Sequence, residues 1–154
     1  MLWVTGIFCI FLILILIYVH IYIQSLKKIY SKHLFDYSEC VRDLLLLKQS
    51  GGKVKEYFDR HRYSEVAVWG IDRFGKVIFR ELCDEGIKIS YCIDDTINNQ
   101  YDILVDIYHP MVVLPRVDVI LCIYPLPREW LNVSKKWDIP IVNLIDVIKE
   151  IRET

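Results

Sequence analysis

The chain has 154 residues, 54% of them apolar, and its 19 basic and 20 acidic side chains leave a formal net charge of -1. This length accommodates about one domain with an accessory segment. A near-neutral chain without a basic stripe interleaved with aromatics lacks the attraction that nucleic acid binding requires, so no nucleic acid partner is expected. The five cysteines form no C-x-x-C pair and no cluster with metal spacing, which predicts isolated buried thiols, a reducing compartment and no metal site.

Residues 1–24 are predicted to form a transmembrane anchor. Residues 2–23 contain no Asp, Glu, Lys or Arg, and at about 1.5 Å per residue they span about 33 Å, enough to cross a bilayer core of roughly 30 Å. Trp3 at one end, and Tyr18 and Tyr22 at the other, are typical interfacial residues. Because no basic residue precedes the segment, it does not resemble a cleaved signal peptide. The alternative is an unusually long buried core helix.

The orientation of this anchor follows from the charges that flank it. Lys27, Lys28 and Lys32 come directly after the apolar segment, and nothing basic precedes it. The positive-inside rule then places the N-terminus outside and the rest of the chain in the cytoplasm. The sequence therefore predicts a single-pass protein of the cell inner membrane, with the lipid bilayer as its first partner.

Residues 25–62 are predicted to form a helical stalk that leads into the following domain. A helix is expected over 26–49 and a short amphipathic helix over 53–60, with His61 suited to the dipole at the end of the second. The first helix carries a coiled-coil-like seam of about two heptads. Its members are Tyr30, Leu34, Tyr37, Val41 and Leu44. The seam either packs on the following domain, which we favour, or pairs two chains in a homodimer.

Residues 63–154 are predicted to form a Rossmann-like α/β domain. A short apolar strand over 66–69 ends on Gly70, a segment of helical period follows as far as Gly86, and a second apolar strand over 87–93 ends on two aspartates. Strand, tight turn, helix, strand is the opening unit of a dinucleotide-binding fold.

The remaining chain continues the alternation of strands and helices. Further strands are expected over 103–107, 117–123 and 139–144, and helices over 127–136 and 145–152. Fully apolar strands such as 117–123 are buried on both faces of a parallel sheet. The expected fold class is thus α/β: a compact, parallel, right-handed sheet of about five strands, preceded by the transmembrane helix and the stalk.

Four motifs of this region carry a family resemblance. They read V-A-V-W-G-I-D-R-F-G-K-V-I-F-R-E-L from Val66, I-S-Y-C-I-D-D from Ile89, V-D-V-I-L-C from Val117 and I-P-I-V-N-L-I-D-V from Ile139. Roughly residues 44–152 resemble the Rossmann-like domains of bacterial surface-polysaccharide biosynthesis proteins. The resemblance implies a domain that binds a nucleotide or a nucleotide-sugar and has polysaccharide-biosynthesis enzymes as partners.

The phosphate-binding turn departs from the family's pattern at one position. The turn G-I-D-R-F-G, from Gly70 to Gly75, has Asp72 in place of the second glycine, which normally lets the backbone approach a pyrophosphate. In one interpretation Asp72 caps the helix, satisfies its free N–H groups and replaces the phosphate. In the other, Asp72 swings aside and Arg73 or Lys76 contacts a phosphate or carboxylate.

Asp94 ends the second predicted strand. In dinucleotide enzymes an acidic residue there binds the ribose hydroxyls, so Asp94 would favour NAD over NADP. Its alternative role is that of a turn residue, which caps the loop together with Asp95 and Asn98. The candidate cofactor-binding residues are Gly70, Asp72, Gly75 and Asp94.

Recognised catalytic motifs are missing from the sequence. It contains no Y-x-x-x-K pair, no D-x-D, no G-x-S-x-G, no P-loop and no H-E-x-x-H, and His33 and His109 have no evident partner. No catalytic residue is predicted. The leading hypothesis is an anchored binding or regulatory module that serves envelope-polysaccharide enzymes. The alternatives are a nucleotide-sugar oxidoreductase or epimerase completed by a partner, and a scaffold without a ligand.

Overall fold

The computed structural model describes residues 2–96, 103–126 and 128–153, with the side chains of residues 2–11, 29, 30, 32, 33, 36, 37, 128 and 129 also outside the description. The chain divides into two compact units, Met1–Glu39 and Cys40–Thr154. The second unit contains the sheet and all the candidate site residues.

The first helix is longer than the sequence predicted. Helix α1 runs without a break from Leu2 to Gln49, so the helix predicted over 26–49 is the continuation of the N-terminal helix and not a separate one. No Gly or Pro lies between residues 24 and 49, and the Ser25 hydroxyl donates to the Tyr22 carbonyl at 2.8 Å, a bond that fits within a helix. Over the residues that the structure describes, no helix meets the length and hydropathy that a membrane crossing requires.

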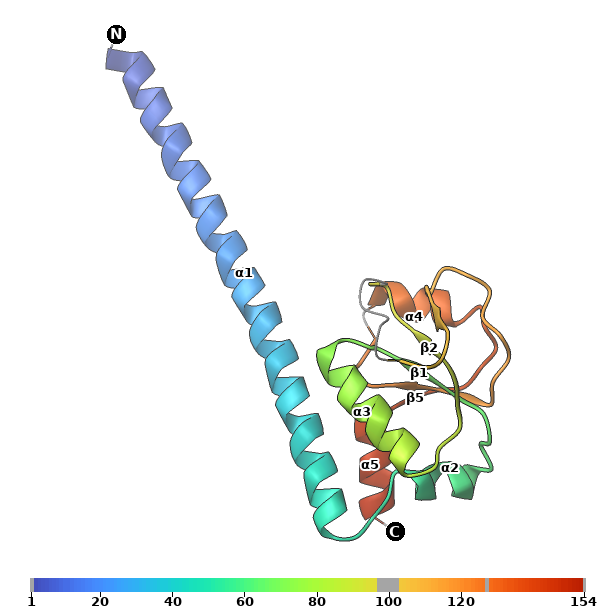
Figure 1. Cartoon of the computed structure of the whole chain (residues 1–154). Helices are drawn as coiled ribbons and strands as arrows, with labels where there is room; N and C mark the ends of the chain where they lie inside the picture. Colours follow the sequence, from blue (N-terminus) through green and yellow to red (C-terminus); the bar gives the residue numbers. More distant parts are fainter. Residues whose placement is uncertain (1, 97–102, 127, 154) are drawn as a thin grey trace. The chain divides into compact units, whose positions relative to one another are not determined.

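Five short parallel strands form the sheet of the second unit (Figure 1). They are β1 Val66–Trp69, β2 Ile89–Ile93, β3 Ile107–Tyr108, β4 Val119–Cys122 and β5 Ile141–Asn143. Their spatial order is β3-β2-β1-β4-β5, with every neighbouring pair parallel. The predicted α/β class and parallel sheet of about five strands are confirmed. All residues of the central strands β1 and β4 are buried, as their unbroken apolar sequences require.

In the described part of the chain, four further helices precede, connect or follow these strands. They are α2 Lys55–His61, α3 Arg73–Asp84, α4 Arg128–Ser134 and α5 Leu144–Arg152. Figure 1 shows α4 on one side of the sheet and α3 and α5 on the other. On the α4 side, the ring of Trp69 lies 6.1 Å from that of Trp130 and 5.2 Å from that of Trp137. Such an aromatic cluster buries much apolar area in a thin layer.

The third strand is shorter than predicted and lies later in the chain. Only Ile107 and Tyr108 pair with β2, opposite Cys92 and Ile93, whereas the sequence indicated a strand over 103–107. Leu104 is fully exposed to solvent. The apolar run at 103–107 was a misleading signal, because hydrophobicity alone does not show which residues reach the ladder of the neighbouring strand.

The last turns of α1 belong to the core of the second unit. Cys40, Leu44 and Leu47 are buried, and Lys48 forms an ion pair with Glu81 of α3. The Leu44 end of the predicted seam therefore packs on the α/β domain. Within the rest of the seam, Leu34 is 65% exposed, and the side chains of Tyr30 and Tyr37 lie outside the described residues.

Among the four cysteines whose side chains the structure describes, three follow the prediction of buried thiols and one does not. Cys40, Cys92 and Cys122 are buried and free, but Cys83 on α3 is exposed. Burial raises the pKa of the Cys40 thiol to about 11, with a smaller contribution from Asp43. It raises the pKa of Cys92 and of Cys122 to about 12. The buried sulfurs are thus kept as thiols at neutral pH, and a thiol rather than a thiolate is a poor nucleophile.

We predict that, of the four described cysteines, Cys83 alone reacts with a thiol reagent in the folded protein. In a Cys9→Ser variant, a thiol-specific reagent is expected to modify Cys83 readily, and to modify the three buried cysteines only after unfolding. Peptide mapping by mass spectrometry before and after denaturation provides the measurement. Modification of Cys92 or Cys122 at the rate of Cys83 in the native protein would contradict the observed packing.

Candidate functional site

The candidate residues meet at the carboxyl ends of the central strands. Gly70 follows β1 and Asp94 follows β2, and parallel strands end at the same edge of a sheet. In the spatial order β3-β2-β1-β4-β5, the chain proceeds from β1 outward to β2 and β3 on one side, and then to β4 and β5 on the other side of β1. In open α/β sheets, ligands bind outside the carboxyl ends of the strands at this switch point.

Two glycines let α3 start directly against the end of β1. Gly70 has φ +100°, a conformation that favours glycine, and its N–H donates to the Ile93 carbonyl at 3.0 Å. A Cβ at Gly75 would lie 1.8 Å from the Gly70 carbonyl oxygen, far inside contact distance. The first and third glycines of the dinucleotide fingerprint therefore keep their structural roles here: one forms the turn and the other allows close packing of helix and strand.

Asp72 occupies the N-cap of α3 with its own carboxylate. Its Oδ1 accepts hydrogen bonds from the backbone N–H of Phe74 at 3.1 Å and of Gly75 at 2.8 Å. The interpretation of Asp72 as a helix cap is confirmed. These N–H groups are the ones that a bound phosphate would use at a helix N-terminus.

Tyr124 is a member of the site that the sequence analysis missed. It follows β4, and its hydroxyl donates to Asp72 Oδ1 at 2.8 Å, so that a single oxygen accepts three hydrogen bonds. Its ring lies 6.1 Å from that of Phe74 and 3.2 Å from the point where a Gly70 Cβ would stand. A polar aromatic residue just after a buried strand was the available signal, because that position faces the same edge as Gly70 and Asp94.

Asp94 acts as a turn residue. We call the region between Asp72 and Asp94, at the carboxyl ends of the strands, the crevice. Asp94 Oδ2 accepts from the Ile71 N–H at 2.7 Å, and Asp94 Oδ1 accepts from the Thr96 N–H at 2.7 Å. The predicted cap of the loop is thus observed, Asp95 also contributes by accepting from the Thr96 hydroxyl, and Asn98 lies outside the described residues. Ribose hydroxyls would have to displace these backbone donors.

Burial raises the pKa of Asp94 above its ordinary value. The two backbone hydrogen bonds oppose this rise, while the carboxylates of Asp95 and Asp72 add to it. A second anion in the crevice would meet both carboxylates, so the local field opposes phosphate and favours neutral or cationic groups.

Arg73 and Lys76, which could contact a ligand in the alternative interpretation, are not held toward the crevice by hydrogen bonds to its carboxylates. Arg73 is exposed and Lys76 is half-buried, and neither side chain forms a hydrogen bond with the carboxylate of Asp72 or of Asp94. Both residues lie on the helix that begins at the crevice, in its first two turns.

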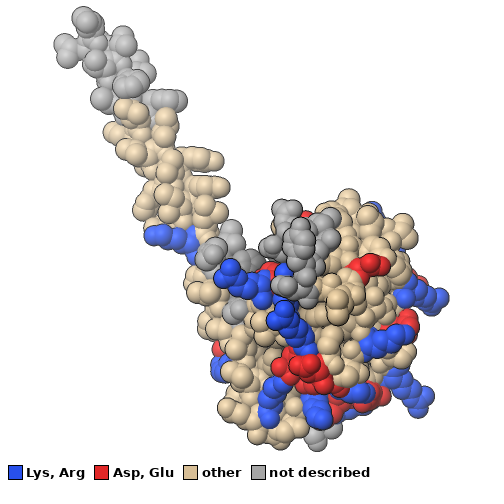
Figure 2. Space-filling model, in the orientation of Figure 1, with Lys and Arg blue, Asp and Glu red and all other residues tan. Residues whose placement is uncertain are grey.

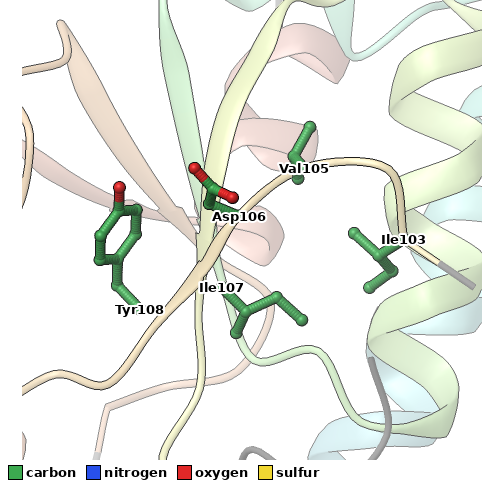
Figure 3. A pocket seen from close by; sticks show the side chains of 5 residues that line it. All are labelled: Ile103, Val105, Asp106, Ile107 and Tyr108. Atoms are coloured by element: carbon green, nitrogen blue, oxygen red, sulfur yellow. The ribbon is translucent and has the colours of Figure 1, made fainter. Parts of the chain in front are cut away.

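A cavity of about 370 Å³ lies along the edge strand β3, whose Tyr108 carbonyl accepts a hydrogen bond from the Asp94 N–H at 3.1 Å. Figure 3 shows that the carboxylate of Asp106 and the ring of Tyr108 point to one side of the strand and Ile107 to the other. Its lining residues are Ile103, Val105, Asp106, Ile107 and Tyr108. None of the predicted site residues lines this cavity.

The two histidines of the second unit have structural partners. His109 Nδ1 accepts a hydrogen bond of 3.2 Å from the backbone N–H of Met111, a contact within its own turn. His61 Nδ1 lies 3.0 Å from the Tyr57 carbonyl, at the end of α2 as predicted. The described residues contain no group of three His, Cys, Asp or Glu side chains that could hold a metal ion.

We predict that Gly75→Ala destabilises the domain by about 1–3 kcal/mol, the range for forcing an extra carbon into a packed site. The methyl group would collide with the Gly70 carbonyl, which is backbone and cannot rotate away. Urea unfolding of the full chain in detergent, followed by tryptophan fluorescence, measures the loss.

Gly86→Ala is the matched control for this substitution. Gly86 has φ +79°, and no atom lies within 4 Å of the point where its Cβ would stand, so alanine there meets backbone strain without a collision. We expect the Gly75 variant to lose more stability than the Gly86 variant. Equal losses would mean that the close contact between α3 and β1 is not a constraint.

We predict opposite pH dependences for Asp94→Asn and Asp118→Asn. The pKa of Asp94 is raised in the fold, so the stability that the native carboxyl contributes is greatest below its unfolded pKa and falls as pH rises through the folded value. The advantage of the native protein over Asp94→Asn is therefore largest in acid. Urea unfolding between about pH 3.5 and 7 provides the measurement.

Asp118 supplies the control of opposite sign. Its carboxylate accepts from the Glu65 and Ser64 N–H groups and from the Ser64 hydroxyl, and these bonds lower its pKa. The advantage over Asp118→Asn is expected to be largest near neutral pH and to fall as pH drops through the lowered pKa. The same sign for both variants would contradict the observed environments.

Comparison of the chain with family models, with curated proteins and with solved structures found no significant match. The resemblance to domains of polysaccharide-biosynthesis proteins stays a prediction from the sequence motifs. The fold and the geometry of the crevice rest on the parallel sheet and on the hydrogen bonds of Asp72 and Asp94 described above.

Proposed function

We propose that this chain is a membrane-anchored, non-catalytic binding or regulatory module, whose Rossmann-like domain acts in the cytoplasm through a partner rather than through a dinucleotide. The observation that carries the proposal is the carboxylate of Asp72, which accepts hydrogen bonds from Phe74, Gly75 and Tyr124. The carboxylate of Asp72 thus occupies the position at the N-terminus of α3 where a bound phosphate would lie.

Energetic considerations support a site closed to pyrophosphate. A phosphate at this position would have to displace Asp72 from two backbone donors and one hydroxyl. Two unit charges about 4 Å apart repel by about 1 kcal/mol in water and about 4 kcal/mol at an effective dielectric constant of 20. A ligand must recover this cost from contacts elsewhere, and Asp94 is already engaged with the Ile71 and Thr96 N–H groups.

The anchor is proposed from the N-terminal sequence and from the character of α1. Residues 2–23 carry no acidic or basic side chain. On α1, large apolar side chains are exposed, among them Leu16 at 68% and Ile21 at 62%. Hydrocarbon is the environment that such surface favours. Lys27 and Lys28 follow directly, so the domain would lie on the cytoplasmic side of the inner membrane.

The pathway and the partners are proposed from the family resemblance. Envelope-polysaccharide enzymes would be the proteins that this module binds or regulates. The competing proposal is a nucleotide-sugar oxidoreductase or epimerase completed by a partner. Burial of Cys92 and Cys122, and the hydrogen bonds that hold Asp94, weigh against reactive groups of the chain's own.

A ligand titration tests the proposal directly. The full chain in detergent micelles is titrated with NAD(H), NADP(H) and UDP- and dTDP-sugars while its unfolding temperature is followed. A ligand present at about 100 times its dissociation constant stabilises by about 2.7 kcal/mol. We expect no shift for the native protein and a shift for Asp72→Gly, in which the helix donors are free.

Tyr124→Phe serves as the control for this titration. It removes one hydrogen bond to Asp72 but leaves the carboxylate on the helix donors, so it is expected to bind none of these ligands. A shift of the native protein by any of them would overturn the closed site. Turnover of a nucleotide-sugar by the purified chain would favour the enzyme instead.

A further inference from the structure

Helix α3 carries a row of positive charges on its exposed face. Arg73, Lys76 and Arg80 are spaced three and four residues apart, which places them on one side of the helix. We call Arg73, Lys76 and Arg80 the α3 stripe. Figure 2 shows Lys and Arg side chains on this side of the domain, with Asp and Glu side chains beside them. The opposite side of the helix is buried in the domain through Phe74, Ile78, Phe79 and Leu82.

The side chains of the α3 stripe are not used inside the protein. Within the described part of the chain, none of the three forms an ion pair or a side-chain hydrogen bond. Other lysines of the domain behave differently: Lys48 pairs with Glu81 and Lys88 with Glu65. The formal net charge of the chain is -1. The α3 stripe is therefore a local group of unpaired positive charges and does not reflect an excess of basic residues in the whole chain.

The acidic side chains beside the α3 stripe leave it positive. Asp72 is turned onto the helix N-terminus by its hydrogen bonds, and Glu81 is neutralised by Lys48. Asp84, one turn after Arg80 and at the last residue of the helix, adds one negative charge at that end of the stripe. Between the cations stands Val77, whose side chain is 57% exposed. Cations without acidic partners on the surface of a domain are attracted to the negative charge of anionic lipid headgroups.

We propose that the α3 stripe docks on the anionic phospholipid headgroups of the membrane that holds the anchor. The inference rests on the proposed anchor, because three charges alone bind a membrane weakly: a basic residue near an anionic surface is worth about fivefold in partitioning. A tether supplies the second attachment that stable binding requires, by keeping the domain at high effective concentration near the bilayer. Docking would hold the crevice, at the N-terminal end of the same helix, close to the membrane surface.

Cys83 provides a reporter on the docking face. It lies three residues after Arg80 on α3, it is exposed, and the other described cysteines are buried. In a Cys9→Ser background, an environment-sensitive dye on Cys83 reports entry into the headgroup layer. The full chain is synthesised in the presence of vesicles of phosphatidylcholine alone, or of phosphatidylcholine with phosphatidylglycerol. Flotation of the vesicles measures attachment, and the dye measures docking.

We expect the chain to float with both kinds of vesicle in high salt, and the dye emission to shift to the blue only on anionic vesicles in low salt. Arg73→Gln/Lys76→Gln/Arg80→Gln is expected to float equally and to lose the shift. Each single substitution is expected to lower the docked-to-free ratio by about fivefold. The control Arg116→Gln/Lys135→Gln/Lys136→Gln removes as many exposed positive charges outside α3 and is expected to keep the shift.

The two assays separate the failure of each proposal. Loss of flotation from neutral vesicles in high salt would overturn the anchor. In that case, docking is measured by flotation with anionic vesicles in low salt. The native chain must float and the triple variant of the α3 stripe must not. A dye that does not respond to anionic lipid, or a shift lost equally in the control variant, would overturn docking while leaving the anchor intact. A shift that appears with an added acidic protein but not with lipid would also overturn it.

Discussion

The close approach of α3 to the end of β1 is the constraint on which the candidate site depends. A side chain at Gly75 would stand 1.8 Å from the Gly70 carbonyl oxygen, so glycine alone permits this packing. The contact directs the N-terminus of α3 toward the carboxyl edge of the sheet, beside the residues that follow β2 and β4. An anion-binding position is therefore built into the fold itself, whatever ligand the domain takes.

What occupies that position distinguishes this domain from a dinucleotide-binding one. Asp72 supplies the negative charge that the helix N-terminus attracts, and Tyr124 and Asp94 hold the surrounding groups. Neither Arg73 nor Lys76 forms a hydrogen bond with the carboxylate of Asp72, which accepts from Phe74, Gly75 and Tyr124 instead. The charges of Arg73 and Lys76 remain directed to the outside of α3, where they are available to an anionic surface. The closed crevice and the proposed docking face thus belong to the same helix.

Much of the fold was predictable because the signals are local. The central strands are unbroken apolar runs, β1 matches its predicted range 66–69, and α5 at Leu144–Arg152 lies within a residue of the prediction. The errors have physical causes. The third strand was misplaced, since pairing with β2 rather than hydrophobicity decides which residues form it. The helix predicted over 26–49 is not separate from the N-terminal one, because a change from apolar to charged side chains does not by itself end a helix.

The sequence by itself determined the alternation of strands and helices and the two glycines of the turn, and it offered the cap formed by Asp72 as one of two interpretations. These depend on contacts between residues at most a few positions apart. Only the tertiary structure decided that Tyr124 donates to Asp72 and that Asp94 holds the Ile71 N–H. It also decided that Cys83 is exposed. The two hydrogen bonds depend on which strands lie side by side, because they connect residues that are distant in the chain. The exposure of Cys83 depends on which face of α3 the domain covers.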